Sequence, residues 1–301
     1  MEDTVDAKEL ARVLSEKRCV EKEEEFERVR QALEGRQKIQ LSAYDDDEKI
    51  EASFMVHRGF NDKYTLLLWR DSGAEVVLDV QGYIASMMVP PLSAKRHSNW
   101  RNPLALKQNV TLVGVTPKFA SACSALERLY RFFEQGFGRD QLRKWQLTTV
   151  GSSLPAITSS TRFVSPVAEL DLWPNGLPLL TDDKDRENVI RQWVGEGKAV
   201  LTEDNVVSYT EVKFDDGRLQ RRDIDPSLFR GGHLVEMGLS VRAVENRDHS
   251  PVQHSFLVHL DSLFLHNRMV TKVWFNINIS SQLPRIRLDS NIKSSADAEE
   301  T

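Results

Sequence analysis

Apolar and polar residues alternate most regularly late in the chain. From residue 235 to residue 243 the odd positions are apolar and the even positions between them are polar or small. Successive side chains of a strand point to opposite faces, so this period of two predicts a strand with one buried face. The apolar positions are Val235, Met237, Leu239, Val241 and Ala243.

The segments around this strand also have the pattern of strands joined by tight turns. Asp216-Gly217 is the strongest of these turn signals, because glycine accepts the positive φ that a two-residue hairpin needs. The strands predicted in this part of the chain are residues 205–214, 218–224, 233–244, 253–266 and 269–279. Together they indicate a mainly antiparallel β-module.

Helical periodicity is confined mostly to the first half. Residues 4–34 and 117–135 are predicted as helices, and the second has one apolar stripe, with Pro117 in its first turn and Gly136 after its last. A short helix is predicted at residues 182–194. Strands are predicted at residues 38–44, 51–58, 64–70 and 75–80, the last two forming a hairpin. Residues 66–69 are continuously apolar, so we expect the helix at 117–135 to cover them.

These patterns predict an α+β fold: N-terminal helices on a small antiparallel sheet, followed by a mainly antiparallel C-terminal β-module. Between them, a segment rich in Pro, Ser and Thr is predicted to be an extended connection. The expected organisation is an N-terminal α+β region (1–145), the connection (146–183), a C-terminal β-rich module (184–280) and a polar tail (281–301). Whether the two halves form one body is left open.

Composition places the chain among globular proteins, with 40% hydrophobic and 28% charged residues in a length of 301. Its net charge of -5 argues against a surface dominated by phosphate binding, but a local basic face is compatible with that value. Two cysteines, Cys19 and Cys123, provide no disulfide framework and too few thiolates for a structural zinc site without histidine. We therefore expect a reducing intracellular compartment, cytoplasm or nucleus.

No membrane association is expected. The N-terminal MEDTVDAKEL is charged where a signal peptide would be apolar, and no apolar run approaches the roughly 20 residues that a membrane span needs. The chain is accordingly expected to be soluble.

Histidines gather late in the chain and raise the question of a metal site. On a regular strand over residues 253–266, His254 and His259 would point to opposite faces, whereas His254 and His266 would share a face about 40 Å apart. This geometry favours structural or surface histidines. No metal ligand and no cofactor are predicted.

A segment between residues 128 and 145 mixes basic and aromatic side chains, which stack on bases and neutralise phosphates in proteins that bind single strands. The alternative is the ordinary solvated face of an amphipathic helix. The candidate nucleic-acid contacts are Arg128, Arg131, Arg139, Arg143 and Lys144.

No catalytic residue is predicted. Cys123 lies on the apolar stripe of a helix, where a buried thiol is inert. The stretch from Gly195 to Lys198 lacks the GxxxxGK[ST] spacing of a phosphate loop, and Ser152 lacks the G-x-S-x-G context of a hydrolase nucleophile. An enzyme whose residues converge only in three dimensions remains an alternative.

The stretches TEDNVVSYTEVKF (202–214) and DPSLFRGGHLVEMGLSV (225–241), with SFLVHLDSLFLH (255–266), resemble the C-terminal part of a group of uncharacterised fungal proteins. Gly231-Gly232 departs from the turn of that group, which usually has one glycine before a polar residue. The resemblance implies a shared β-rich module and no activity.

The leading hypothesis from the sequence is a non-enzymatic intracellular binding or scaffold protein that presents sheet surfaces or edges to a protein partner. Nucleic-acid association through residues 128–145 is the first alternative, and an enzyme of undetected class is the second. The sequence indicates neither the partner nor the oligomeric state.

Overall fold

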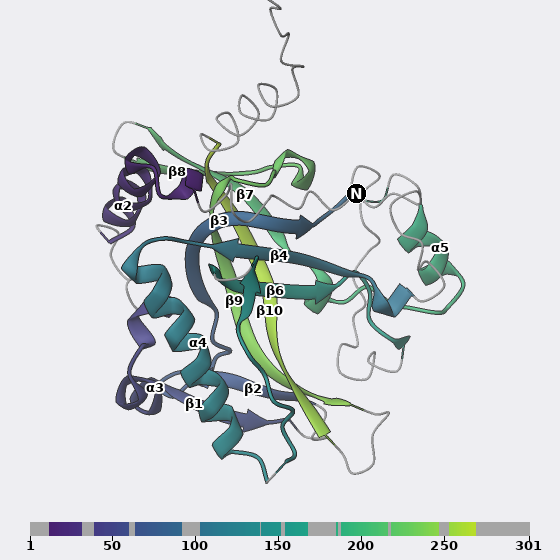
Figure 1. The fold of residues 1–301 in the computed structure, drawn as a ribbon. Helices are drawn as coiled ribbons and strands as arrows, with labels where there is room; N and C mark the ends of the chain where they lie inside the picture. The colour runs from purple at the N-terminus through teal and green to yellow at the C-terminus, as the bar shows by residue number, and fades with distance from the viewer. Residues whose placement is uncertain are drawn as a thin grey trace, which may run out of the picture.

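The structure, a computed structural model, describes residues 12–31, 39–59, 64–91, 103–138, 140–151, 154–167, 185, 188–215, 218–246 and 253–268. It confirms the α+β class: a large, mainly antiparallel sheet with helices packed against it (Figure 1). The strand predicted at 269–279, the tail at 281–301 and Arg139 lie outside the described residues.

Among the described residues, ten strands form one sheet in the order β5-β6-β4-β3-β9-β10-β7-β8, with β2 attached to β9 and β1 to β2. All described pairings between these strands are antiparallel except that of β10 with β7. The strands are β1 (Phe54–Arg58), β2 (Tyr64–Trp69), β3 (Leu78–Met88), β4 (Lys107–Val113), β5 (Thr148–Val150), β6 (Leu154–Arg162), β7 (Ser208–Asp215), β8 (Arg218–Asp223), β9 (Leu234–Asn246) and β10 (Gln253–Asn267).

Strand β9 joins the two halves of the chain. One of its edges pairs with β10, while the other pairs with β3 from Leu234 to Leu239 and then with β2 from Arg242 to Val244. Its 13 residues are long enough to hold both N-terminal strands on one edge. Strands from both predicted regions therefore belong to a single sheet.

The sheet curls back on itself. In Figure 1, β4 and β6 cross in front of β9 and β10, and β3 bends sharply between them. The two layers touch, because the Ser159 hydroxyl of β6 donates a hydrogen bond to the Val258 carbonyl of β10 over 3.3 Å. This curl encloses most of the hydrophobic core.

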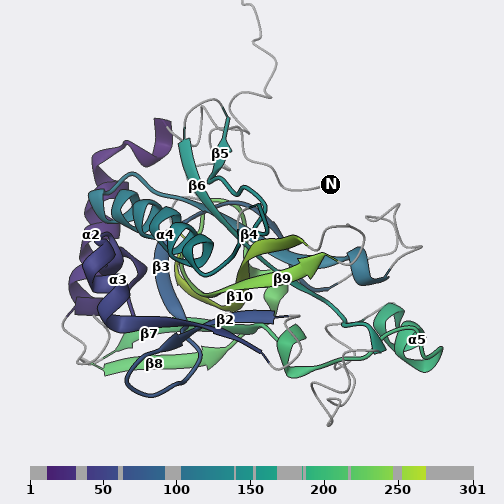
Figure 2. The same cartoon turned by 90° about the horizontal axis from the view of Figure 1, so that it is seen from below.

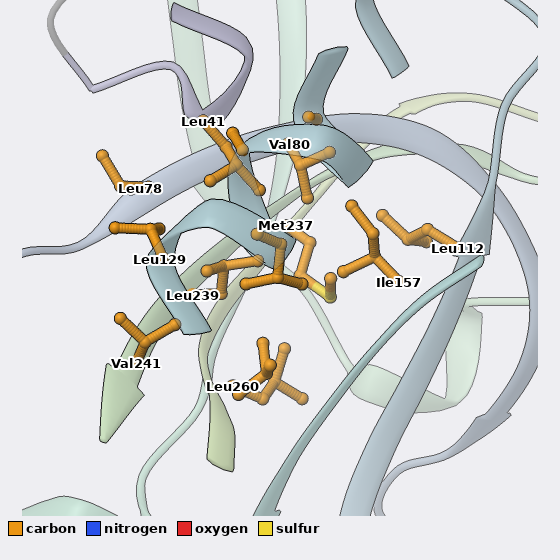
Figure 3. Packing of buried hydrophobic residues seen from close by; sticks show 14 of the residues in the cluster. Leu41, Leu78, Val80, Leu112, Leu129, Ile157, Met237, Leu239, Val241 and Leu260 are labelled. Atoms are coloured by element: carbon orange, nitrogen blue, oxygen red, sulfur yellow. The ribbon is translucent and has the colours of Figure 1, made fainter. Parts of the chain in front are cut away.

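The longest described helix, α4 (Pro117–Gln135), matches the predicted range and packs into this core. The Thr116 side chain caps its first turn by accepting a hydrogen bond from the Phe119 amide over 3.4 Å. The short elements η1 (Leu41–Tyr44) and α3 (Asp47–Ser53) lie beside it. Figure 3 shows part of the packing, in which the labelled residues are Leu41, Leu78, Val80, Leu112, Leu129, Ile157, Met237, Leu239, Val241 and Leu260.

Helix α2 (Lys17–Gln31) covers the opposite face of the sheet at one end. Cys19 packs there with Tyr83 of β3 and Leu234 of β9, and the Tyr83 hydroxyl donates to the Cys19 carbonyl over 2.9 Å. Helix α5 (Val189–Gly195) lies on the far side of the molecule from α2 in both Figure 1 and Figure 2. Single turns of 3-10 helix are η3 (Pro103–Ala105), η5 (Glu203–Asn205) and η6 (Pro226–Leu228).

The structure differs from the predicted pattern in several places, among them strand β4 and residues 81–88 of β3, which were not predicted as strands. Residues 41–44, predicted as the end of a strand, form a 3-10 turn. Residues 51–53, predicted as the start of the next strand, belong to α3, which the Asp46 side chain caps by accepting a hydrogen bond from the Glu48 amide over 3.0 Å. Residues 154–162, predicted as part of a connection, form β6. Their small Ser and Thr side chains let β6 approach β10 closely. On the neighbouring strand β4, the Thr111 hydroxyl forms a hydrogen bond with the Thr158 hydroxyl over 3.0 Å.

In the part of the chain that the structure describes, no helix is both long and apolar enough to cross a membrane.

Candidate functional site

Two aromatic side chains are fixed at the surface beside the C-terminal end of α4. The Tyr130 ring lies 5.9 Å from the Trp145 ring and 5.5 Å from the ring of buried Phe256, between centroids. Trp145 lies 5.2 Å from Phe256. Tyr130 and Trp145 remain half-buried, so each presents part of its ring to solvent while Phe256 holds it in place.

The segment that carries Trp145 is tied to the first residues of β10. The Arg143 amide donates to the His254 carbonyl over 2.8 Å, and the His254 amide donates to the Gln141 carbonyl over 2.7 Å. Leu142 between them is buried. These contacts give the segment a defined position against the sheet.

The predicted nucleic-acid contacts differ in their surroundings. Arg131, Arg143 and Lys144 are exposed, and no ion pair among the described residues involves them. Arg128 instead pairs with Asp47 at 2.8 Å and links α4 to α3. We call Tyr130, Arg131, Arg143, Lys144 and Trp145 the basic aromatic surface.

One further cation lies near this surface and was missed by the sequence analysis. Arg58, at the end of β1, lies 4.9 Å from the centroid of the Phe137 ring and donates to the Gly136 carbonyl over 2.5 Å. A single arginine at the end of a strand, far in sequence from residues 128–145, has no pattern that predicts a place at this surface. Only the fold of β1 against the end of α4 brings it here.

The histidines of β10 are separated by a β-bulge. Leu260 pairs with Leu239 and Ser262 with Gly238, so the residue between them, Asp261, is extra and reverses the alternation. The expectation that His254 and His266 share a face is therefore wrong.

The two rings have different neighbours on opposite faces. His254 packs on Phe137 at 4.9 Å, and His266 packs on Phe26 of α2 at 5.3 Å. Among the described residues, no group of three or more His, Cys, Asp or Glu side chains is arranged to hold a metal ion.

A buried charged network joins β9 to η5 and to the turn after β2. The Arg242 guanidinium contacts Glu75 at 2.9 Å and also pairs with Asp204. Burial raises the pKa of Asp261 nearby to about 7, and burial, with the charge of Arg242, lowers the pKa of His259 to about 4. The adjacent cavity measures only about 70 Å³, so this network fits a structural role better than catalysis.

A larger cavity of about 420 Å³ lies between α2, β3 and the start of α4. Glu23 and Gln81 line it, with 2% and 7% of their surfaces exposed. Glu23 Oε1 accepts a hydrogen bond from the Thr116 hydroxyl over 2.8 Å, and the Gln81 side-chain amide donates to the Glu23 carbonyl over 3.0 Å. Burial raises the pKa of Glu23 to about 7. The sequence analysis missed this cavity.

Three residues were considered from the sequence as a nucleophile or as part of a phosphate loop, namely Cys123, Lys198 and Ser152. Burial raises the pKa of Cys123 to about 12, so its thiol stays protonated and inert. Lys198 pairs with Glu196 in an exposed turn that follows α5. Ser152 lies outside the described residues.

The comparisons with known proteins identify no family for this chain. No family model matches the chain, and no curated protein matches it. Among solved structures, it is similar to gp2.5, a single-stranded DNA-binding protein encoded by bacteriophage T7, with a TM-score of 0.29 and 10% identity, covering 64% of this chain and 86% of that one. The single-stranded DNA-binding protein from bacteriophage Enc34 gives a TM-score of 0.31 and 10% identity, with 71% and 95% covered. Similarity at this level carries over no functional residue.

Proposed function

We propose that this chain is a non-enzymatic intracellular protein that binds single-stranded nucleic acid through the basic aromatic surface. The observation that carries the proposal is the fixed pair of half-exposed rings, Tyr130 and Trp145, flanked by exposed cations that form no ion pair among the described residues. Rings of this kind stack on unpaired bases, and neighbouring cations neutralise the phosphates between them.

A single strand suits this surface better than a duplex. Stacking on a ring requires an unpaired base, whereas a duplex exposes mainly phosphates and groove edges. The cations are few and the whole chain carries a net charge of -5, so binding must rest on the rings as well as on charge. The proposal therefore predicts modest affinity with a shallow salt dependence.

The test is fluorescence anisotropy of labelled oligothymidine and oligouridine over a series of salt concentrations. We expect Arg143→Ala with Lys144→Ala to weaken binding and to reduce the slope of log K against log salt by roughly 1.4, because two phosphate contacts are lost. The control is Lys49→Ala with Lys198→Ala, which removes two exposed cations elsewhere that pair with Asp45 and Glu196. Equal losses in both double variants, or no binding at low salt, would contradict the proposal.

A protein partner at a sheet edge is the second candidate function. Strand β8 ends the sheet and pairs only with β7 among the described strands, so its other edge offers backbone groups for strand addition. Its exposed Arg221 and Arg222 are also the charges that protect such edges from unspecific pairing. Capture of partners from the native cell, with and without nuclease, separates the two candidates, since partners that resist nuclease favour the edge.

A further inference from the structure

The cavity between α2, β3 and α4 is independent of the basic aromatic surface. It lies at the first turn of α4, whereas Tyr130 and Trp145 lie at the other end of this 19-residue helix. Its volume of about 420 Å³ falls in the usual range of small-molecule sites, roughly 300 to 1,000 Å³.

Two residues that line this cavity, Glu23 and Gln81, each have one buried side-chain oxygen, Oε2 and Oε1 respectively, without a hydrogen-bond partner among the described residues. The other polar atom of each side chain is hydrogen-bonded and fixes its position. Glu23 Oε1 accepts a hydrogen bond from the Thr116 hydroxyl, and the Gln81 side-chain nitrogen donates to the Glu23 carbonyl. Leaving a buried acceptor unsatisfied is unfavourable, because the desolvation of that atom is not compensated. A ligand that offers hydrogen-bond donors to both atoms would provide this compensation.

The charges around the cavity favour a cation. Carboxylates of Glu23, Glu24, Glu27 and Asp79 line it, against the cationic side chains of Arg28 and Lys118. Lys118 is paired with Glu27. The start of α4 is already capped by the Thr116 hydroxyl, which makes this helix end a poor anion site.

Part of the remaining wall is apolar, beside the polar residues Gln40, Ser42 and Thr116. Val80 of β3 and Pro117, Phe119 and Ala122 of α4 face the cavity, so it can hold an apolar group next to the carboxylates. We propose that this cavity binds a small organic cation, an amine or amidine carried on a flat apolar body, whose N–H groups donate to Glu23 and Gln81.

The protonation of Glu23 gives this binding a pH dependence. Burial keeps the pKa of Glu23 near 7, so part of the population is neutral at that pH, and a bound cation stabilises the carboxylate. Glu24, Glu27 and Arg28 of α2, Asp79 of β3 and Lys118 of α4 are the other charges around it. Affinity should therefore rise from pH 6 to pH 8, and binding should release protons.

The probe is benzamidine, titrated into the full chain by calorimetry and by ¹H–¹⁵N correlation spectra. We expect saturable binding that shifts the side-chain amide signal of Gln81 and the backbone signal of Phe119, with no binding of benzoate. Glu23→Gln should weaken benzamidine at least about tenfold, since a charged hydrogen-bond acceptor becomes neutral. The control Glu21→Gln removes the same charge from an exposed position of the same helix that does not line the cavity, and it should change affinity less than about threefold.

A second variant, Gln81→Met, removes the other acceptor and should also weaken binding, so the test does not depend on one folded variant. Absence of saturable binding at millimolar benzamidine, equal weakening by the two glutamate variants, or equal binding of benzoate would overturn the proposal. The Arg143→Ala, Lys144→Ala variant should keep benzamidine binding unchanged, which separates this site from the nucleic-acid surface.

Discussion

Glu23 shows how one buried side chain links packing to chemistry. It lies on the side of α2 that also carries Cys19 and Phe26, and it is almost completely buried against β3 and the start of α4. Its helical spacing from these two apolar residues was the signal available in the sequence. The surrounding acidic residues masked it, because a run of glutamates normally marks a solvated face.

The pKa of Glu23 predicts a pH-dependent stability. Its folded pKa of about 7 lies above the ordinary glutamate value of 4.5, so the folded state binds the extra proton, and stability is lost as pH rises between these values. The free energy of unfolding of the wild type should therefore fall relative to that of Glu23→Gln as the pH rises. We expect the difference between variant and wild type to shift in favour of the variant by on the order of 3 kcal/mol from pH 4 to pH 8. Urea unfolding at a series of pH values measures this difference.

Asp261 has a pKa raised in the same direction, so the variant should retain part of the wild-type pH dependence. Glu21→Gln, which removes an exposed carboxylate from the same helix, serves as the control and should run parallel to wild type. A curve for Glu23→Gln that is also parallel would refute the assignment.

At the scale of elements, the turn from β4 into α4 shows how closely a helix packs on the backbone that precedes it. Gly114 lies so close to the Phe119 ring that a Cβ at this position would be 2.5 Å from the ring's Cγ. The first turn of the helix therefore packs directly on the backbone that precedes it. A side chain at position 114 would push Phe119 out of the core.

We expect Gly114→Ala to lower the free energy of unfolding by about 1 to 3 kcal/mol, the usual cost of overpacking. Gly195→Ala is the matched control, because no atom lies within 4 Å of the added Cβ and the residue ends helix α5. It should be neutral or slightly stabilising. Thermal unfolding of both variants provides the measurement, and similar melting temperatures would contradict the expectation.

Elements with strong periodicity were predicted well from sequence. Helix α4 and strand β9 follow from their apolar positions, and both bury the expected side chains. The prediction of one buried face is wrong for β9, because Glu236, Ser240 and Arg242 on its other face are buried too. Helix α3 and strand β6 were not predicted, since the first depends on the Asp46 cap and the second buries Ser and Thr against β10. Local pattern is a weak guide where capping or close packing of small side chains decides the element.

At the scale of the molecule, β9 holds the fold together by pairing with β3 and β2 on one edge and β10 on the other. Its apolar side chains share one core with α4. A fragment of residues 184–280 would lack these N-terminal partners, and a fragment of residues 1–145 would lack the strand they pair with.

We therefore expect neither fragment to fold by itself, whereas the full chain should unfold in one cooperative transition. Circular dichroism and the dispersion of amide signals in NMR spectra test this directly. A dispersed spectrum and a cooperative melt from either fragment would show that the two regions are separate domains.

The sequence by itself determined the α+β class, the helix at 117–135 and the apolar one of the two buried faces of β9, because periodicity is a property of neighbouring residues. Tertiary structure alone decided the single sheet, the bulge at Asp261 that separates His254 from His266, and the meeting of Tyr130 with Trp145 on Phe256. It also decided the cavity around Glu23 and Gln81. These features depend on contacts between residues far apart in the chain, which no local pattern specifies.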